Sequence, residues 1–286
     1  MLYGISPYFD MSESSRPIPA INDPLFAAAY DELTFWSSRF GALLFKHLEL
    51  LPGIQILDLG CATGFPSFEL AQVHGASCRV FGVDIWKESI FRAAARKRFF
   101  QLTSIELIAA DASFLPFPKN QFDLIVSNLG LNNFKDPITV LAECHRVAKS
   151  HARIVITTNL QGHYREFYDV FRKVLLRLGK SHCFEKLAAN EQHRGTEESV
   201  CRLMKDAGFT VARVISDEFQ MHFLDGTSLL NHLLTRIGFL TGWQGVVDEK
   251  DRGRLFEVLE QELNGIATSQ GSLTMTVPML FVEAQA

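Results

Sequence analysis

The sequence predicts an α/β fold in which helices cover both faces of a doubly wound, mostly parallel sheet. Two observations support this prediction most directly. Short apolar segments alternate with longer segments of helical periodicity, as βαβ units require. A glycine turn follows the first apolar segment and leads at once into a helical one. With 286 residues, 47% of them hydrophobic, the chain can also bury a core of the necessary size.

The predicted elements follow one another in a regular order. Strands are expected at residues 54–59, 79–84, 105–109, 122–128, 153–158, 210–223 and 273–284, and helices at residues 65–73, 87–100 and 136–149, with a further one between Thr196 and Gly208. Asp136 before Pro137 is a typical helix start. We expect Pro278, inside the last strand, at a sheet edge or a bulge, because proline cannot donate to a neighbouring strand.

The turn after the first strand is the most informative segment of the chain. Its sequence is ILDLGCATG at residues 56–64, where Gly60 and Gly64 permit backbone angles that a Cβ opposes. The following helix, with Pro66 in its first turn, would point its free N–H groups into a crevice at the sheet rim. Asp84 ends the next strand, where a carboxylate can accept hydrogen bonds from both hydroxyls of a ribose. These features predict an adenosine-type ligand.

Other observations disfavour whole classes of function. The dinucleotide fingerprint GxGxxG would need glycines where the chain has Ala62 and Phe65, so a dehydrogenase is disfavoured. A net charge of -4 does not indicate a protein that binds nucleic acid, because such proteins usually carry an excess of positive charge. The one basic cluster is interpreted as a solvated helix face; it consists of Arg92, Arg96, Lys97 and Arg98. The five cysteines form no CxxC pair, and no cysteine or histidine spacing indicates a metal site.

No segment indicates export or membrane insertion. The N-terminus lacks the basic-then-apolar pattern of a signal peptide. No apolar stretch reaches the roughly eighteen residues that a spanning helix needs. Together with the unpaired cysteines, these observations predict a cytoplasmic protein without a membrane span, as a monomer or a homodimer.

Four motifs together resemble the class I S-adenosylmethionine-dependent methyltransferases, near the ubiquinone/menaquinone C-methyltransferases and the methyltransferase type 11 group. They are ILDLGCATG at 56–64, VFGVDIW at 80–86, IAADASFLPFPKNQFDLIVSN at 108–128 and LAECHRVAKSHARIVITTN at 141–159. The resemblance implies a Rossmann-like sheet of seven strands, with the last strand antiparallel between the fifth and the sixth. The family usually has GCGTG, so Ala62 adds a methyl group where the methionine end of the cofactor would lie.

The resemblance also assigns residues to S-adenosylmethionine. Asp58 would orient the ammonium group, or it would bond the backbone of the turn. Asp84 would hold the ribose, or it would cap the next helix; Trp86 would lie against the adenine, or it would cover the sheet edge. Asp111 and the N–H of Ala112 would contact the adenine, or form an ordinary turn. The set expected to bind the cofactor is Asp58, Gly60, Cys61, Ala62, Gly64, Asp84, Ile85, Trp86, Asp111, Ala112, Asn128 and Leu129.

Six segments are expected along the chain. They are an N-terminal helical lid (1–50), the cofactor-binding core (51–159), a helical insertion (160–195), a core helix and sixth strand (196–225), a second helical insertion (226–267) and the final strand (268–286). The insertions leave the rim where the cofactor would bind, so we expect them to form a cap over the substrate. Tyr30 and Trp36 of the lid would cover the cofactor or pack between helices.

The sequence does not single out a catalytic base. The weak candidates are His163, Tyr164 and His222, with Glu166 as a further carboxylate and Asn132 and Asn133 as orienting groups. Methyl transfer from a sulfonium needs mainly alignment of the reactants and a dry pocket, so a dedicated base is not required.

These inferences predict a methyltransferase that transfers the methyl group of S-adenosylmethionine to a small molecule by in-line displacement. The 24 phenylalanines favour a hydrophobic or aromatic acceptor, and the atom methylated stays open among O, N, S and C. The alternative from another class is a non-catalytic S-adenosylmethionine-binding regulatory protein, suggested by Ala62 and by the lack of a recognisable base. Asparagines in the segment SNLGLNNF, where acidic residues are usual, disfavour aminopropyl transfer and methylation of nucleobase amines.

Overall fold

The computed structural model describes residues 23–31 and 34–286. Its seven-stranded sheet has the order β3-β2-β1-β4-β5-β7-β6. All neighbouring strands are parallel except β7, which pairs antiparallel with both β5 and β6, so the predicted sheet is confirmed. The strands are β1 Gln55–Leu59, β2 Arg79–Asp84, β3 Ile105–Ala109, β4 Phe122–Asn128, β5 Ala148–Asn159, β6 Thr210–Phe223 and β7 Leu273–Gln285.

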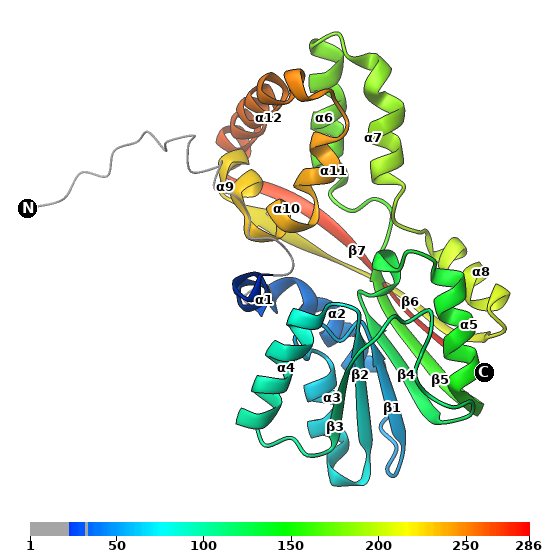
Figure 1. Cartoon of the computed structure of the whole chain (residues 1–286). Helices are drawn as coiled ribbons and strands as arrows, with labels where there is room; N and C mark the ends of the chain where they lie inside the picture. Colours follow the sequence, from blue (N-terminus) through cyan, green and yellow to red (C-terminus); the bar gives the residue numbers. More distant parts are fainter. Residues whose placement is uncertain (1–22, 32–33) are drawn as a thin grey trace, which may run out of the picture.

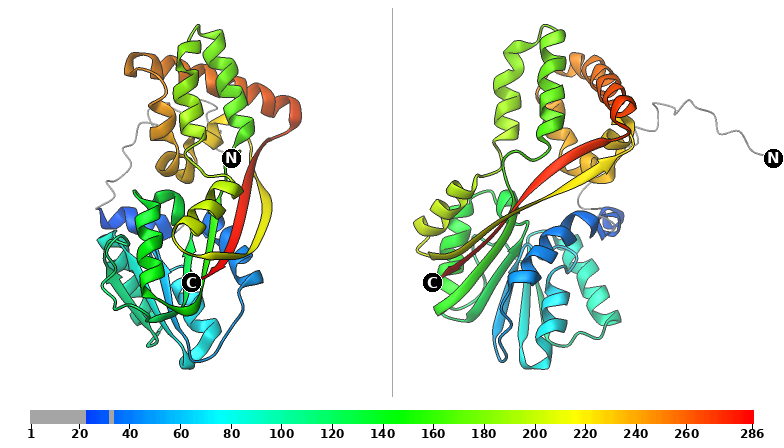
Figure 2. Two further views of the ribbon diagram at one scale, coloured as in Figure 1. Left: turned by 90° about the vertical axis from the view of Figure 1, so that its right-hand side faces the viewer. Right: turned by 180° about the vertical axis from the view of Figure 1, so that it is seen from behind.

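Helices cover both faces of the sheet (Figures 1 and 2). Side chains of α2, α3 and α4 pack on one face, against alternate residues such as Ile56 and Val80. Side chains of α5 and α8 pack on the other face, against Leu57 and Ile125. This alternation follows from the period-two geometry of a strand. The helices are α1 Pro24–Tyr30, α2 Thr34–His47, α3 Ser67–His74, α4 Lys87–Phe99, α5 Pro137–Val147 and α8 Glu197–Asp206.

The remaining helices form a cap beyond the carboxyl ends of the strands (Figure 1). They come from two separate insertions: α6 Arg165–Arg177 and α7 Phe184–Glu191 follow β5, while α9 Gly226–Asn231, α10 Leu233–Gly238, α11 Leu240–Gln244 and α12 Glu249–Gln270 lie between β6 and β7. The two insertions share one core. The ring of Trp243 stacks on Phe167 at 3.9 Å, and its Nε1 donates to the hydroxyl of Tyr168 at 3.2 Å.

A two-stranded ribbon carries this cap. Pairing between β5 and β7 ends at Asn159 and Met279, whereas pairing between β6 and β7 continues to Phe223 and Leu273. The end of β6 and the beginning of β7 therefore project past the sheet and reach the cap helices (Figure 2). Pro278 pairs with Glu218 of β6 without a register shift, so there is no bulge at this position. Pairing of β7 with β5 ends at Met279, so Pro278 has a strand neighbour on one side only and lies at a local edge, as expected. Pro278 is tolerated because direct pairing with β5 has already stopped at the next residue.

The predicted N-termini of the helices at Asp136 and Thr196 are confirmed, and one other helix begins two residues later than predicted. Asp136 Oδ1 accepts from the N–H of Thr139, and Thr196 forms a reciprocal capping box with Ser199. The helix expected at 65–73 begins instead at Ser67, with Pro66 at its N-cap position. In the part of the chain that the structure describes, no helix is long and apolar enough to cross a membrane.

Thr196→Ala tests the capping box of α8. The substitution removes the acceptor of the Ser199 N–H, so we expect a loss of about 1 kcal/mol in the free energy of unfolding. Urea unfolding monitored by circular dichroism measures the loss. Thr268→Ala, at an exposed position inside α12, serves as the matched control and is expected to shift stability by less than about 0.5 kcal/mol. Equal effects of the two substitutions would contradict the capping role.

Candidate functional site

The glycine turn joins β1 to α3 through three residues of positive φ. They are Gly60 at +75°, Ala62 at +43° and Gly64 at +115°. The N–H groups of Gly60 and Cys61 donate to the carbonyl of Val83, which ties the turn to β2. A Cβ at Gly64 would lie 2.4 Å from the ring of Phe68, so only glycine fits there. Ala62 holds a left-handed conformation that costs an alanine about 1–2 kcal/mol.

Asp84 holds this turn in place from the tip of β2. Its Oδ2 accepts from the N–H of Ala62 at 2.9 Å, and its Oδ1 accepts from the N–H of Trp86 at 2.8 Å. Burial raises the pKa of Asp84, while these backbone hydrogen bonds lower it. A carboxylate has about four lone-pair positions, so the two bonds leave capacity for further donors. Asp84 thus bonds the backbone at the start of α4 and still has acceptor sites for a ligand.

Asp58 lies under the turn and is completely buried. Its Oδ2 accepts at 2.5 Å from the hydroxyl of Ser67, the residue at which the turn enters α3. Its Oδ1 has no hydrogen-bond partner among the described residues. Burial raises the pKa of Asp58 to about 7. Such an orphaned carboxylate oxygen is costly, and a cationic donor from a ligand would satisfy it.

Helix α1 covers this part of the rim. The rings of Phe26 and Tyr30 contact Trp86 edge-on, with centroids 5.6 and 5.5 Å away. Burial, followed by the charge of Asp84, raises the pKa of Tyr30. The aromatic rings therefore place α1 directly over the strand tip that carries Asp84.

Ion pairs hold α1 in this position. Asp31 accepts from Arg92 at 2.7 Å and from Arg96 at 3.0 Å, and Arg96 also donates to the carbonyl of Thr63 in the glycine turn. The interpretation of this basic cluster as a solvated face is therefore wrong for Arg96, whereas Arg92 is exposed and forms its ion pair at the surface. Their partner lies more than sixty positions away, so sequence periodicity gave no signal for it. We call these contacts the Asp31 latch.

The other predicted cofactor residues lie along the same rim. Asp111 is exposed and accepts from the N–H of Ser113, and Ile85 is 69% exposed. Asn128 is buried between Thr157 of β5, which donates to its Oδ1 at 2.7 Å, and the carbonyl of Ser37. Leu129 has a φ of +66°. Because β1 to β4 are parallel neighbours, the whole predicted set lies at their carboxyl ends.

The base candidates occupy very different environments. His163 is 1% exposed, and neither of its ring nitrogens has a partner within the described chain. Tyr164 donates its buried hydroxyl to Sδ of Met221, and Glu166 accepts from Thr276. Of these three candidates, His163 is therefore the one whose buried polar atoms have no partner among the described residues.

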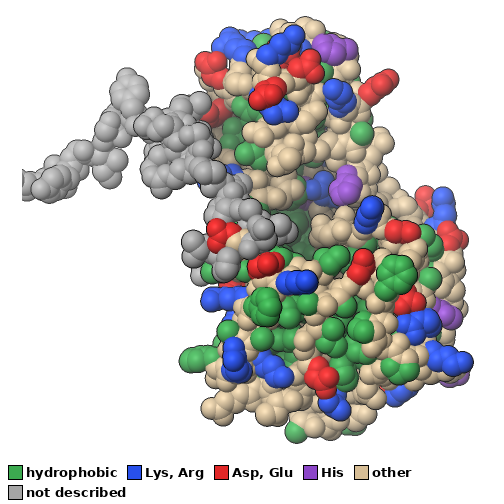
Figure 3. Space-filling view, in the orientation of Figure 1, with side chains coloured by type: hydrophobic (Ala, Val, Ile, Leu, Met, Phe, Trp, Pro, Cys, Tyr) green, Lys and Arg blue, Asp and Glu red, His purple; other side chains and the backbone are tan. Residues whose placement is uncertain are grey.

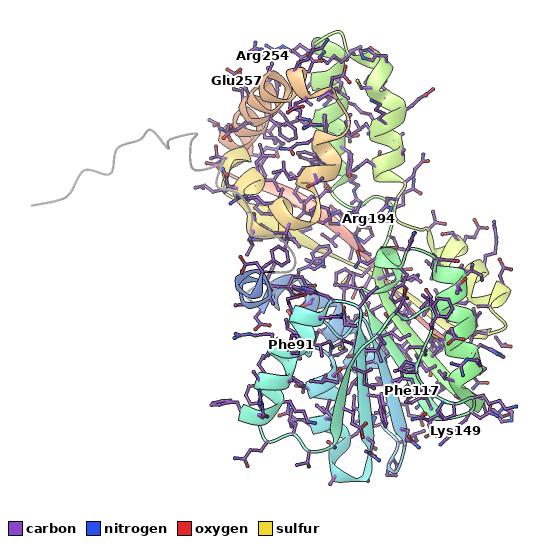
Figure 4. All side chains as sticks on the ribbon, in the orientation of Figure 1. Phe91, Phe117, Lys149, Arg194, Arg254 and Glu257 are labelled. Atoms are coloured by element: carbon purple, nitrogen blue, oxygen red, sulfur yellow. The ribbon has the colours of Figure 1, made fainter. Side chains whose placement is uncertain are left out.

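His222 is exposed on the β6–β7 ribbon, where its Nδ1 lies 3.2 Å from the hydroxyl of Thr274. Asn132 donates to Thr158 and Asn159 and so stabilises the rim. Sequence reasoning missed Arg194, which lies between α7 and α8 and is only 9% exposed (Figure 4). Its burial depends on two insertions packing together, which no local pattern records.

A separate apolar groove lies between α2 and α3. Its lining includes Phe45, Phe65 and Val73, but none of the predicted cofactor residues. The described residues contain no group of three side chains that could hold a metal ion.

Comparison with known proteins identifies the family. Residues 50–257 match a family model described as a methyltransferase domain. The demethylmenaquinone methyltransferase of Lactococcus lactis is 30% identical over 200 residues, which cover 67% of this chain and 77% of the relative. That of Oceanobacillus iheyensis is 32% identical over 139 residues, 47% of this chain and 58% of the relative.

A solved structure agrees on the fold. A SAM-dependent methyltransferase from Aquifex aeolicus aligns with a TM-score of 0.52 at 21% identity, covering 68% of this chain and 92% of that one. Fold, motifs and family model point to the same group. The chain therefore belongs to the class I S-adenosylmethionine-dependent methyltransferases, in the branch of the ubiquinone and menaquinone C-methyltransferases.

Proposed function

We propose that the protein transfers the methyl group of S-adenosylmethionine to a small, planar aromatic acceptor held between the sheet rim and the cap. The observation that carries this proposal is the convergence of Asp58, the glycine turn and Asp84 at one rim. Oδ1 of Asp58 has no hydrogen-bond donor among the described residues. The carboxylate of Asp84 accepts two backbone hydrogen bonds and can accept more from a ligand. A ligand with an ammonium group at one end and a ribose at the other would meet both requirements.

We assign these residues to the parts of S-adenosylmethionine as follows. Asp58 would accept from the ammonium group, and Asp84 from the ribose hydroxyls. Trp86, beneath α1, would flank the adenine together with Asp111. The remaining contacts would come from Gly60, Cys61, Ala62, Gly64, Ile85, Ala112, Asn128 and Leu129. When bound, the cofactor supplies a methyl group on a sulfonium, and the sulfur keeps both electrons as the carbon–sulfur bond breaks.

An aromatic cluster supports a planar acceptor. Trp36 of α2 contacts Phe40, Phe219, Phe239 and His163, with ring centroids between 5.2 and 6.2 Å away. The cluster thus joins the lid to the cap. Figure 3 shows that the surface is hollowed at this junction, with hydrophobic side chains inside. The relatives are named for demethylmenaquinone, which belongs to the same chemical class of planar, apolar ring systems.

Alignment of the two reactants would supply most of the rate enhancement. Holding them in an attack geometry contributes up to about 7–11 kcal/mol, and the cap would exclude water from the reacting atoms. Turnover with any aromatic acceptor would exclude the regulatory alternative. A cytoplasmic location and a monomeric or homodimeric state stay predictions.

Asp84→Ala tests the ribose assignment. The substitution removes charge-assisted hydrogen bonds, so we expect affinity for S-adenosylhomocysteine to fall about ten- to a hundredfold. Isothermal titration calorimetry measures the change, and thermal melting verifies that the variant folds. Asp169→Ala, at an exposed position on α6, is the matched control and should bind normally. Unchanged affinity in Asp84→Ala would sink the assignment.

The pH dependence of cofactor binding tests Asp58. An ammonium group binds the ionised carboxylate, whose pKa in the free protein is about 7. Affinity should therefore be full above that pH and should fall by up to about tenfold per pH unit below it. Calorimetric titrations between about pH 5.5 and 8.5 would show the slope. Asp58→Asn should bind weakly with no slope over this range, and a slope that survives in the variant would contradict the assignment.

Arg92→Ala tests the Asp31 latch. The ion pair is partly exposed, so its loss should cost at most about 1 kcal/mol, and cofactor release should accelerate by about two- to fivefold. Stopped-flow displacement of S-adenosylhomocysteine measures the rate. Arg98→Ala, exposed on the same helix, is the control. Identical release rates for both variants would show that α1 is not held by this latch.

A further inference from the structure

Arg194 is a buried cation that forms no ion pair within residues 23–31 and 34–286. It lies between the cap and the sheet (Figure 4) and is 9% exposed. No aspartate or glutamate of the described residues pairs with it. Its guanidinium carbon lies 5.0 Å from the centre of the Phe239 ring. Arginine stays charged in proteins, and a buried charge is usually paired, so this site lacks a counter-ion.

His163 lies next to this cation and has unused polar atoms. Its ring stacks on Tyr164 at 4.1 Å and contacts Trp36 at 5.2 Å and Phe239 at 4.9 Å. Burial, followed by the charge of Arg194, holds the pKa of His163 well below its usual range. The neutral imidazole therefore offers one donor and one acceptor, and neither is used within the described chain.

Both side chains lie between the cofactor rim and the cap. His163 comes four residues after β5 ends at Asn159. Trp36, which contacts His163, precedes Ser37, whose carbonyl accepts from Asn128 at the tip of β4. Phe239 is shared by Arg194 and His163 from the cap side. Aromatic rings therefore enclose one positive charge and one free imidazole beside the rim.

We propose that Arg194 and His163 bind an ionised oxygen attached to the ring of the aromatic acceptor, as in a phenolate or an enolate. This inference rests on the proposed function and specifies the acceptor's charge. The ionised oxygen supplies the counter-ion that Arg194 lacks, and the imidazole N–H of His163 donates a second hydrogen bond to it. The aromatic walls select a planar ring system.

An ionised acceptor simplifies the transfer. Its proton is lost to solvent before binding, and its electron pair then forms the bond to the methyl carbon. The anionic acceptor and the sulfonium become a neutral product and a neutral thioether. If carbon is methylated, the neutral product is first a ring ketone. Its ring C–H proton then leaves to solvent, and the electrons of that bond return the charge to the oxygen. Binding of the anion thus replaces the dedicated base that the sequence does not show.

The test compares two probes that differ in charge. 2-Hydroxy-1,4-naphthoquinone ionises at its ring oxygen, and 2-methoxy-1,4-naphthoquinone has the same rings without the charge. Both are titrated calorimetrically at pH 8, with and without S-adenosylhomocysteine. We expect the ionised probe to bind at least about tenfold tighter under both conditions, because a charge-assisted hydrogen bond is at stake.

Substitutions test which side chains cause the preference for the ionised probe over the neutral one. Arg194→Met should bind the two probes within about twofold of each other and keep the wild-type affinity for S-adenosylhomocysteine, whereas Arg194→Lys should retain part of the preference. His163→Phe should weaken binding of the ionised probe by about two- to tenfold. Arg254→Met is the control, because Arg254 is exposed on α12 and pairs with Glu257 (Figure 4).

The outcomes separate this inference from the proposed function. Equal binding of the two probes to the wild type, or a preference that persists in a folded Arg194→Met, would overturn the inference. Failure of the wild type to bind S-adenosylhomocysteine would instead contradict the proposed function, while the probe preference without cofactor would still test Arg194. Thermal melting verifies the fold of each variant, and Arg194→Lys keeps the test valid if Arg194→Met does not fold.

Discussion

The carboxylate of Asp84 accepts hydrogen bonds from two segments that are more than twenty residues apart. Through the N–H of Ala62 it fixes the glycine turn, and through the N–H of Trp86 it fixes the start of α4. Because α4 carries the arginines that hold Asp31, the position of the lid follows from the same strand tip. Turn, helix and lid thus meet at one half-buried acid, and the left-handed conformation of Ala62 is maintained by the hydrogen bond from its N–H to Asp84.

The cap depends on a different constraint, the unequal lengths of the strand pairs. The ribbon of β6 and β7 continues after β5 has ended, and it carries helices from two insertions over the rim. The aromatic cluster around Trp36 and Phe239 then joins the cap to the lid. This arrangement buries Arg194 and His163 beside the cofactor rim, where an ionised acceptor would complete their bonding.

Local patterns in the sequence predict most of the fold, whereas contacts between distant segments escape them. Apolar and polar residues alternate from Phe219 to Phe223, and the strand expected at roughly residues 210–223 is found at Thr210–Phe223. The motifs locate Asp58 and Asp84, because the carboxyl ends of parallel strands meet at one rim. The pairing of Arg92 with Asp31 and the burial of Arg194 both depend on how remote elements pack, so no local signal predicts them.

A crystal structure with S-adenosylhomocysteine bound would show whether Asp58 and Asp84 hold the cofactor. We expect the ligand's ammonium within about 3 Å of the Oδ1 of Asp58 and its ribose hydroxyls on the carboxylate of Asp84, beneath α1. A ligand bound elsewhere, or one at this rim that leaves Oδ1 of Asp58 without a partner, would contradict this assignment.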